Sequence, residues 1–258
     1  MVPDYPAPFQ TILDREPERP DGITTAEIDY DADGTACRGF LATPVGVQNA
    51  PGVLVVHDWS GVGDYAQLRC EMLARLGYVA FAGDIYGANT RPSPDQAPLV
   101  ASGFYRDQPL FRARLRAAYD RLLAEDTVDP TRTAAIGYCF GGAGVLQLAR
   151  TGADLVGAVT FHGSLQAGPE GEAAAIRAKV LILTGASDPV VPDEAVLAVQ
   201  NEFRTVPDLD WQIITYASAM HAFTLPTADA PDHGAQFNAR AEARSWVAMK
   251  DFLAEIFA

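Results

Sequence analysis

Cys139 is the residue in this sequence whose surroundings most favour chemistry. It lies in the run Gly137-Tyr138-Cys139-Phe140-Gly141, between an apolar β-type segment and a helical one. A nucleophile on a sharp strand-to-helix turn needs small residues two positions before and after it, because neighbouring elements crowd the turn. Backbone N–H groups at the start of the helix favour a thiolate, and the N–H of Phe140 is a natural donor to an oxyanion. Since buried cysteines are common, the pattern alone leaves a structural role open.

Two later residues complete a catalytic set with Cys139. Asp188 lies 49 residues after the cysteine and His221 another 33 residues on, each directly after a predicted strand. Nucleophile, acid and histidine occur in this order in hydrolases with such a turn. His221 would take the thiol proton and Asp188 would hold the imidazole tautomer. Asp84 also follows a strand and is the rival acid, although its position is more typical of a turn.

A second oxyanion donor is expected from the loop that follows the predicted strand 52–57. The loop reads Asp58-Trp59-Ser60-Gly61, and the N–H of Trp59 is the candidate. The side chain of Trp59 could instead form a wall of the pocket, and the two roles do not exclude each other.

The elements that must position these residues alternate between short β-branched runs and longer amphipathic segments, which is typical of βαβ units. The pattern predicts an α/β fold with a mostly parallel central sheet, helices on both faces and an N-terminal antiparallel edge pair. We expect a single domain over 1–258, with the Pro-rich stretch 87–108 as a candidate lid or substrate loop. Strands are predicted at 26–30, 37–42, 52–57, 78–82, 133–137, 155–161, 180–184 and 211–216, and helices at 64–76, 111–122, 143–150, 193–203 and 235–257.

Composition narrows the function classes. The chain of 258 residues has 33 acidic and 19 basic residues, a formal net charge of −14, so nucleic acid and anionic membranes are unlikely partners. Three cysteines are too few for a disulfide framework. The first residues show no signal-peptide pattern, and we expect a soluble cytoplasmic protein, a monomer or a homodimer. His162 and His233 lack Cys or carboxylate neighbours at metal-ligand spacing, so no metal is expected.

Several motifs together resemble the dienelactone hydrolase (carboxymethylenebutenolidase) family, which has the α/β-hydrolase fold. The resemblance covers residues 25–257. The motifs are the segments 57–63, 83–87, 137–142, 185–192 and 221–223. The resemblance implies hydrolysis of a lactone or related ester, without a cofactor, through a triad at Cys139, Asp188 and His221. It also makes Asp58, Tyr86 and Phe223 candidates for binding substrate or gating the thiol.

Two positions depart from the family pattern. Dienelactone-cleaving members carry a Glu at the position of Asp58, and an Arg shortly after the catalytic His where this chain has Leu225. Leu225 cannot make a charge-assisted contact with a carboxylate, so dienelactone itself fits only if Arg91 or Arg106 supplies the charge. A neutral ester or lactone fits this acidic chain better than a dianion does.

The sequence therefore predicts a hydrolase of carboxylic esters or lactones that works through an acyl-enzyme on Cys139. A thioesterase or acyl transferase using the same triad is one alternative. The other is a non-catalytic relative that binds or senses a small ligand, which the changes at Asp58 and Leu225 favour.

Overall fold

A computed structural model describes residues 4–258 of the chain. It divides into two compact units, Met1–Thr133 and Ala134–Ala258, and each is described by itself. This division leaves the expectation of a single domain a prediction.

The first unit contains four strands in the order β1-β2-β4-β3. β1 and β2 form the expected antiparallel pair, β2 also pairs antiparallel with β4, and β3 runs parallel to β4. The β-branched run in β3 is fully buried, as its composition predicts. The elements are α1 (Ala7–Leu13), β1 (Ile23–Ala32), β2 (Thr35–Pro44), β3 (Ala50–Val56), α2 (Asp64–Arg75), β4 (Val79–Gly83), α3 (Ala97–Arg106) and α4 (Gln108–Leu123), and β5 (Val128–Tyr138) begins here.

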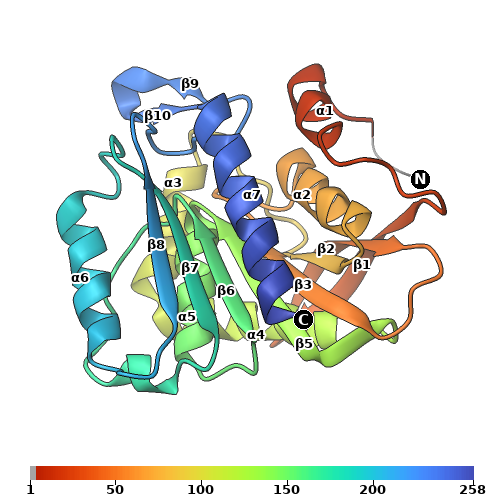
Figure 1. Cartoon of the computed structure of the whole chain (residues 1–258), viewed down its shortest axis with the longest axis horizontal. Helices are drawn as coiled ribbons and strands as arrows, with labels where there is room; N and C mark the ends of the chain where they lie inside the picture. The colour runs from red at the N-terminus through yellow and green to blue at the C-terminus, as the bar shows by residue number, and fades with distance from the viewer. Residues whose placement is uncertain (1–3) are drawn as a thin grey trace. The chain divides into compact units, whose positions relative to one another are not determined.

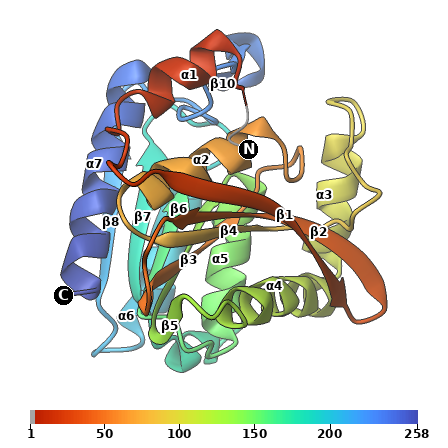
Figure 2. The same cartoon turned by 90° about the vertical axis from the view of Figure 1, so that its right-hand side faces the viewer.

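Helices α2 and α4 lie on opposite faces of the strands of the first unit (Figure 2). The approach of α4 is close at Gly83, where a Cβ atom would lie 2.5 Å from the Cβ of Ala118. Two helices were not predicted. α1 buries Phe9, Ile12 and Leu13 although its segment is short, and α3 occupies part of the stretch 87–108 that was expected to be a loop.

The second unit is parallel throughout its main sheet, in the order β5-β6-β7-β8. Helices α5 and α7 lie on opposite faces of these strands (Figures 1 and 2). Its elements are α5 (Phe140–Arg150), β6 (Gly157–Phe161), η1 (Glu172–Ala175), β7 (Lys179–Gly185), α6 (Asp193–Arg204), β8 (Trp211–Tyr216), β9 (Asp229–Ala230), η2 (Pro231–His233), β10 (Ala235–Gln236) and α7 (Ala239–Ile256).

The prediction that the last helix starts at residue 235 was wrong. Ala235 and Gln236 form β10, which pairs with β9, and Ala235 also bridges to His221. The helix starts at Ala239, after the side chain of Asn238 accepts a hydrogen bond from the N–H of Ala241 at 3.0 Å. Asn is a favoured residue at such a cap. Ala235 and Gln236 therefore support residues 217–228, the loop between β8 and β9 that carries His221 and is called the histidine loop below.

No helix within residues 4–258 is long and apolar enough to cross a membrane. The three cysteines are all free thiols. Cys37 and Cys70 are buried, and Cys139 is partly exposed.

Candidate active site

Cys139 occupies a strained backbone position between β5 and α5. Its φ is +52° and its ψ −112°, a conformation that non-glycine residues rarely adopt. A Cβ atom on Gly137 would lie 2.1 Å from the carbonyl oxygen of Gly141, so this position requires glycine. On Gly142, a Cβ would lie 2.6 Å from the Cα of Gly163. The close packing that the Gly-x-Cys-x-Gly pattern predicted is therefore present at Gly137.

Backbone hydrogen bonds hold the strained turn on both sides. The N–H of Cys139 donates to the carbonyl of Phe161 at the end of β6 (3.0 Å). The carbonyl of Cys139 accepts from the N–H groups of Gly142 (3.0 Å) and Ala143 (3.3 Å). Phe140 is the first residue of α5, so its N–H belongs to the helix turn that begins beside the sulfur.

Asp188 lies in the loop that follows β7, with its side chain buried. Its Oδ1 accepts hydrogen bonds from the N–H groups of Val190 (2.8 Å) and Val191 (3.2 Å). The loop itself is tied down because the N–H of Ser187 donates to the carbonyl of Ala219 (2.9 Å). These bonds fix one carboxylate oxygen and leave Oδ2 to bind His221.

The His221 ring connects the other two residues. Its Nδ1 lies 2.9 Å from Asp188 Oδ2, and its Nε2 lies 3.0 Å from Cys139 Sγ. The backbone of His221 is held by Gly234, whose carbonyl accepts from its N–H (2.9 Å), and by Gln236, whose N–H donates to its carbonyl (3.0 Å). The structure thus brings together the three residues that the sequence singled out.

The environment of His221 favours its protonated form. Burial by itself would lower the pKa of this imidazole. The negative charge of a thiolate at Cys139 and the hydrogen bonds that the ring donates to Asp188 and Cys139 outweigh burial, and they raise the pKa of His221 to about 10. The site therefore favours the imidazolium form of His221.

His162 is a neighbour of the site to which sequence reasoning gave no role. It follows β6 with a φ of +39°, and its N–H donates to the carbonyl of Leu183 (2.8 Å). Its Nε2 lies 2.6 Å from Thr224 Oγ1, and its ring stands edge-on to His221 with centroids 5.3 Å apart. His162 therefore supports the face of the His221 ring. The sequence signal that could have pointed to His162 is its position directly after β6, because β6 pairs with β5, the strand that ends just before Cys139.

Phe223 and Leu225 follow His221 in the same loop. Phe223 is fully buried and packs against His162 at 5.2 Å and Tyr216 at 5.6 Å between ring centroids. The N–H of Leu225 donates to the carbonyl of Ala222 (2.9 Å), which closes a turn. These contacts show Phe223 supporting the histidine loop, and its predicted contact with substrate stays a prediction.

The remaining predicted site residues lie in the first unit. Asp58 is buried, and its Oδ1 accepts from the N–H of Ser60 at 2.8 Å and from the Ser60 hydroxyl. Trp59 is 41% exposed. The buried ring of Tyr86 packs against His57 with centroids 4.7 Å apart. The predicted parts of these residues in oxyanion binding, thiol gating or substrate binding stay predictions.

The two candidate arginines of the first unit differ in their contacts and exposure. Arg91 forms an ion pair with the buried carboxylate of Asp84 (3.4 Å) and also donates to the carbonyl of Thr90 (2.9 Å). Arg106 is exposed at the end of α3. Arg91 is therefore engaged within its own unit, and a substrate role for either arginine stays a prediction. Residues 4–258 contain no group of three or more His, Cys, Asp or Glu side chains arranged to hold a metal ion.

Comparison with known proteins defines the class. The model of the dienelactone hydrolase family matches residues 37–257. A solved structure described as a dienelactone hydrolase-like promiscuous phosphotriesterase from metagenomic libraries is 40% identical, with a TM-score of 0.88 over 92% of this chain and 99% of that one. A protein of Aquifex aeolicus, provisionally named carboxymethylenebutenolidase, is 26% identical over 76% of this chain and 85% of its own length.

A thermophilic esterase of Thermogutta terrifontis is 17% identical with a TM-score of 0.62, over 93% of this chain and 97% of that one, and shows the fold alone. The predicted α/β-hydrolase fold is confirmed. The chain belongs to the dienelactone hydrolase family, and it is a hydrolase of the class that acts on ester or lactone bonds.

Proposed function

We propose that this protein hydrolyses carboxylic esters or lactones through a covalent acyl-enzyme on Cys139. The observation that carries the proposal is the position of His221, 3.0 Å from Cys139 Sγ on one side and 2.9 Å from Asp188 Oδ2 on the other. Both distances are within reach for proton transfer, and the order of the groups is that of a nucleophilic triad.

The reaction begins once the thiol proton has passed to His221 Nε2, and the thiolate then attacks the acyl carbon. The resulting oxyanion is stabilised by the N–H of Phe140 at the start of α5, with the N–H of Trp59 as the second proposed donor. The C–O bond to the leaving group then breaks, and the imidazolium gives its proton to the leaving alkoxide. A thioester on Cys139 remains.

Water completes the cycle. His221 removes a proton from a water molecule that attacks the thioester, the C–S bond breaks, and the thiolate recovers the proton. The products are the acid and the alcohol, or a hydroxy acid when the substrate is a lactone. Throughout, Asp188 holds Nδ1 of the ring and stabilises the imidazolium.

The substrate that fits best is uncharged. Leu225 occupies the position where dienelactone-cleaving relatives are expected to carry an arginine, and Arg91 is already paired with Asp84. The net charge of −14 also disfavours the approach of an anion. A neutral short-chain ester or lactone is therefore the proposed substrate class.

The test is hydrolysis of p-nitrophenyl acetate and dihydrocoumarin by the wild type, by Cys139→Ala and by Cys37→Ala as the matched control. We expect Cys139→Ala to lose about 10³-fold or more in kcat/KM, and Cys37→Ala to keep its activity. Rapid acid quench and peptide mass analysis should find the acyl group on Cys139. Full activity of Cys139→Ala would refute the mechanism, and protection of Cys139 from alkylation without turnover would favour a ligand-binding protein.

A phosphotriester is the second candidate substrate, because the relative that is 40% identical is described as a promiscuous phosphotriesterase. The same sulfur would attack phosphorus and displace an aryl oxide. Paraoxon assayed with the same three proteins tests this candidate: p-nitrophenol release that depends on Cys139 supports it, and no release by the wild type excludes it.

A further inference from the structure

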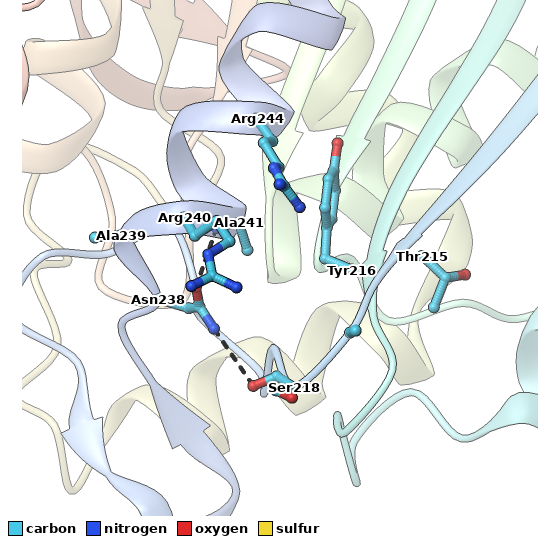
Figure 3. Close-up of a pocket in the computed structure, with 9 residues that line it drawn as sticks. Thr215, Tyr216, Ser218, Asn238, Ala239, Arg240, Ala241 and Arg244 are labelled. Atoms are coloured by element: carbon cyan, nitrogen blue, oxygen red, sulfur yellow. Dashed lines mark hydrogen bonds between the residues drawn. The ribbon is translucent and has the colours of Figure 1, made fainter.

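The backbone of the histidine loop is strained at two positions. Ser218 and Ala222 have positive φ values, +60° and +55°, which residues other than glycine rarely adopt. Such conformations persist only where the surrounding contacts fix them. One of these contacts comes from the cap of α7, where Asn238 Nδ2 donates to the carbonyl of Ser218 at 3.4 Å (Figure 3). The position of His221 therefore depends on the contacts that hold this loop.

A second contact is made by a buried polar pair, His162 and Thr224. Each residue is 1% exposed, and His162 Nε2 lies 2.6 Å from Thr224 Oγ1. Thr224 follows His221 in the histidine loop, so this hydrogen bond joins the loop to the end of β6. The ring of His162 also lies against the ring of His221, with centroids 5.3 Å apart and planes inclined at 69°. His162 thus contacts the loop at the proposed general base and at the residue that closes the turn behind it.

The backbone around His162 is fixed to the elements that carry the other two residues of the proposed triad. The carbonyl of Phe161 accepts the N–H of Cys139 (3.0 Å). The N–H of His162 donates to the carbonyl of Leu183 (2.8 Å) in β7, the strand that leads into the loop of Asp188. His162 is therefore anchored relative to both the thiol and the acid, and its side chain connects the histidine loop to them.

The polar character of this pair favours a role in orientation over a role in stability. A hydrogen bond is directional, whereas the burial of apolar surface is not. Replacing both members of a buried hydrogen-bonded pair by apolar groups of the same shape can be nearly neutral for stability. A core position that only had to be filled would therefore not need His162 and Thr224. A loop that must hold an imidazole in one orientation does benefit from a directional bond.

We infer that His162, through its ring and its hydrogen bond to Thr224, is a positioning residue that orients the imidazole of His221. The inference rests on the proposed function, in which Nε2 of that imidazole must face the sulfur while Nδ1 faces the carboxylate. Asp188 fixes the ring at Nδ1 only, and the contact with His162 prevents the ring from tilting about that hydrogen bond. A misplacement of about 1 Å in such a group can lower a rate by about 10²-fold.

The first experiment replaces the hydroxyl of Thr224. Thr224→Val removes the hydrogen bond and keeps the shape, whereas Thr224→Ser keeps the hydroxyl. The matched control is Thr160→Val, because Thr160 is also fully buried and its hydroxyl has no hydrogen-bond partner within residues 4–258. With p-nitrophenyl acetate we expect Thr224→Val to lose about 10- to 100-fold in kcat, with KM within about twofold of the wild type. Thr224→Ser should recover most of the activity, and Thr160→Val should match the wild type.

A double variant separates orientation from stability. His162→Phe/Thr224→Val replaces both members of the pair by apolar side chains of similar shape, so its urea midpoint should stay close to that of the wild type. Its kcat should stay as low as that of Thr224→Val. Recovery of the wild-type kcat in the double variant would show that the pair only fills space and would overturn the inference. The same conclusion would follow from equal kcat values for Thr224→Val and Thr160→Val.

Alkylation of Cys139 provides a readout that needs no turnover. Iodoacetamide reacts with the thiolate, so its rate at neutral pH reports how well His221 holds the ionised sulfur. We expect this rate to fall by about fivefold or more in Thr224→Val and to stay unchanged in Thr160→Val. Equal rates in the two folded variants would overturn the inference. A wild type that hydrolyses no ester would instead refute the proposed function, and the alkylation rates would still decide whether His162 positions the ring.

Discussion

The two units contain the same three residue types with different partners. The first unit has Cys37, His57 and Asp84, and the second has Cys139, His221 and Asp188. Both aspartates are buried after a parallel strand, and both histidines are buried. Residue type and burial alone therefore do not distinguish a catalytic set from a structural one.

In the first unit main-chain groups and arginine side chains satisfy these three groups. Asp84 accepts from the N–H groups of Arg38 (3.0 Å) and Gly87 (3.1 Å), and His57 Nε2 accepts from the N–H of Ile85 (3.2 Å). Cys37 contacts Arg114 and the carbonyl of Thr35. His57 Nδ1 also lies 2.5 Å from the carbonyl oxygen of Asp58. Main-chain groups therefore occupy both ring nitrogens, and the ring cannot exchange a proton with a substrate.

In the second unit the side chains satisfy one another. Asp188 keeps one oxygen for His221, and the second nitrogen of that ring contacts only a thiol that can ionise. The comparison shows that a buried histidine can transfer protons only when its ring contacts another titratable side chain.

The largest effect is expected when each aspartate is replaced by asparagine. In Asp188→Asn the amide cannot stabilise the imidazolium, so we expect kcat/KM for aryl esters to fall by about 10³- to 10⁴-fold. Asp84→Asn should stay within a few-fold of the wild type. Steady-state kinetics measures both variants, with folding checked by circular dichroism. Comparable losses in the two folded variants would contradict the assignment of Asp188 over its rival.

Alkylation by iodoacetamide tests whether the three cysteines differ in reactivity. Cys37 and Cys70 are almost fully buried, and burial raises the pKa of each thiol. We expect iodoacetamide at neutral pH to modify Cys139 at least about tenfold faster than either of them, because the thiolate is the reactive form. Peptide mass analysis over time gives the three rates, and His221→Ala should slow the reaction at Cys139 alone. Equal rates at Cys37 and Cys139 in the native chain would remove the distinction between the two units.

The stability of the first unit should depend on Asp84. Asp84→Asn replaces one acceptor oxygen by an NH₂ group, which leaves a buried N–H donor without its partner. We expect a loss of about 1–3 kcal/mol in the free energy of unfolding, measured with urea. Asp154→Asn is the control, because its ion pair with Arg177 is exposed and should contribute less than about 1 kcal/mol. An unchanged urea midpoint for Asp84→Asn would show that the backbone bonds to Asp84 contribute little.

Much of the fold could be predicted from local patterns. The β-branched runs 52–57 and 180–184 correspond to β3 and β7, and Gly137 and Gly141 predicted the tight turn at Cys139. α3 was missed because Pro and polar residues precede a short apolar face. The start of α7 was missed because 235–236 pair with β9, a contact that helical periodicity does not encode.

The candidate site, like the fold, could be predicted from the sequence only in part. The order of Cys139, Asp188 and His221 along the chain could be recognised, because each follows a strand and parallel strands end at one edge of a sheet. The contact of His162 with the His221 ring could not be predicted. It depends on which side chains meet across loops, and such contacts leave no spacing in the sequence.

The pH titration of His57 and His221 compares the two units in solution. The pKa of His57 is lowered, mainly by burial, so this ring should stay neutral at neutral pH. The pKa of His221 is raised to about 10, so it should stay protonated. Cys139→Ala removes the strongest effect that raises the pKa of His221, and burial then opposes Asp188 alone, so this pKa should fall. Cys37→Ala should leave it unchanged. Imidazole ¹⁵N chemical shifts followed against pH report each ring, and a His221 that titrates alike in the wild type and in Cys139→Ala would mean that the thiol carries no charge beside it.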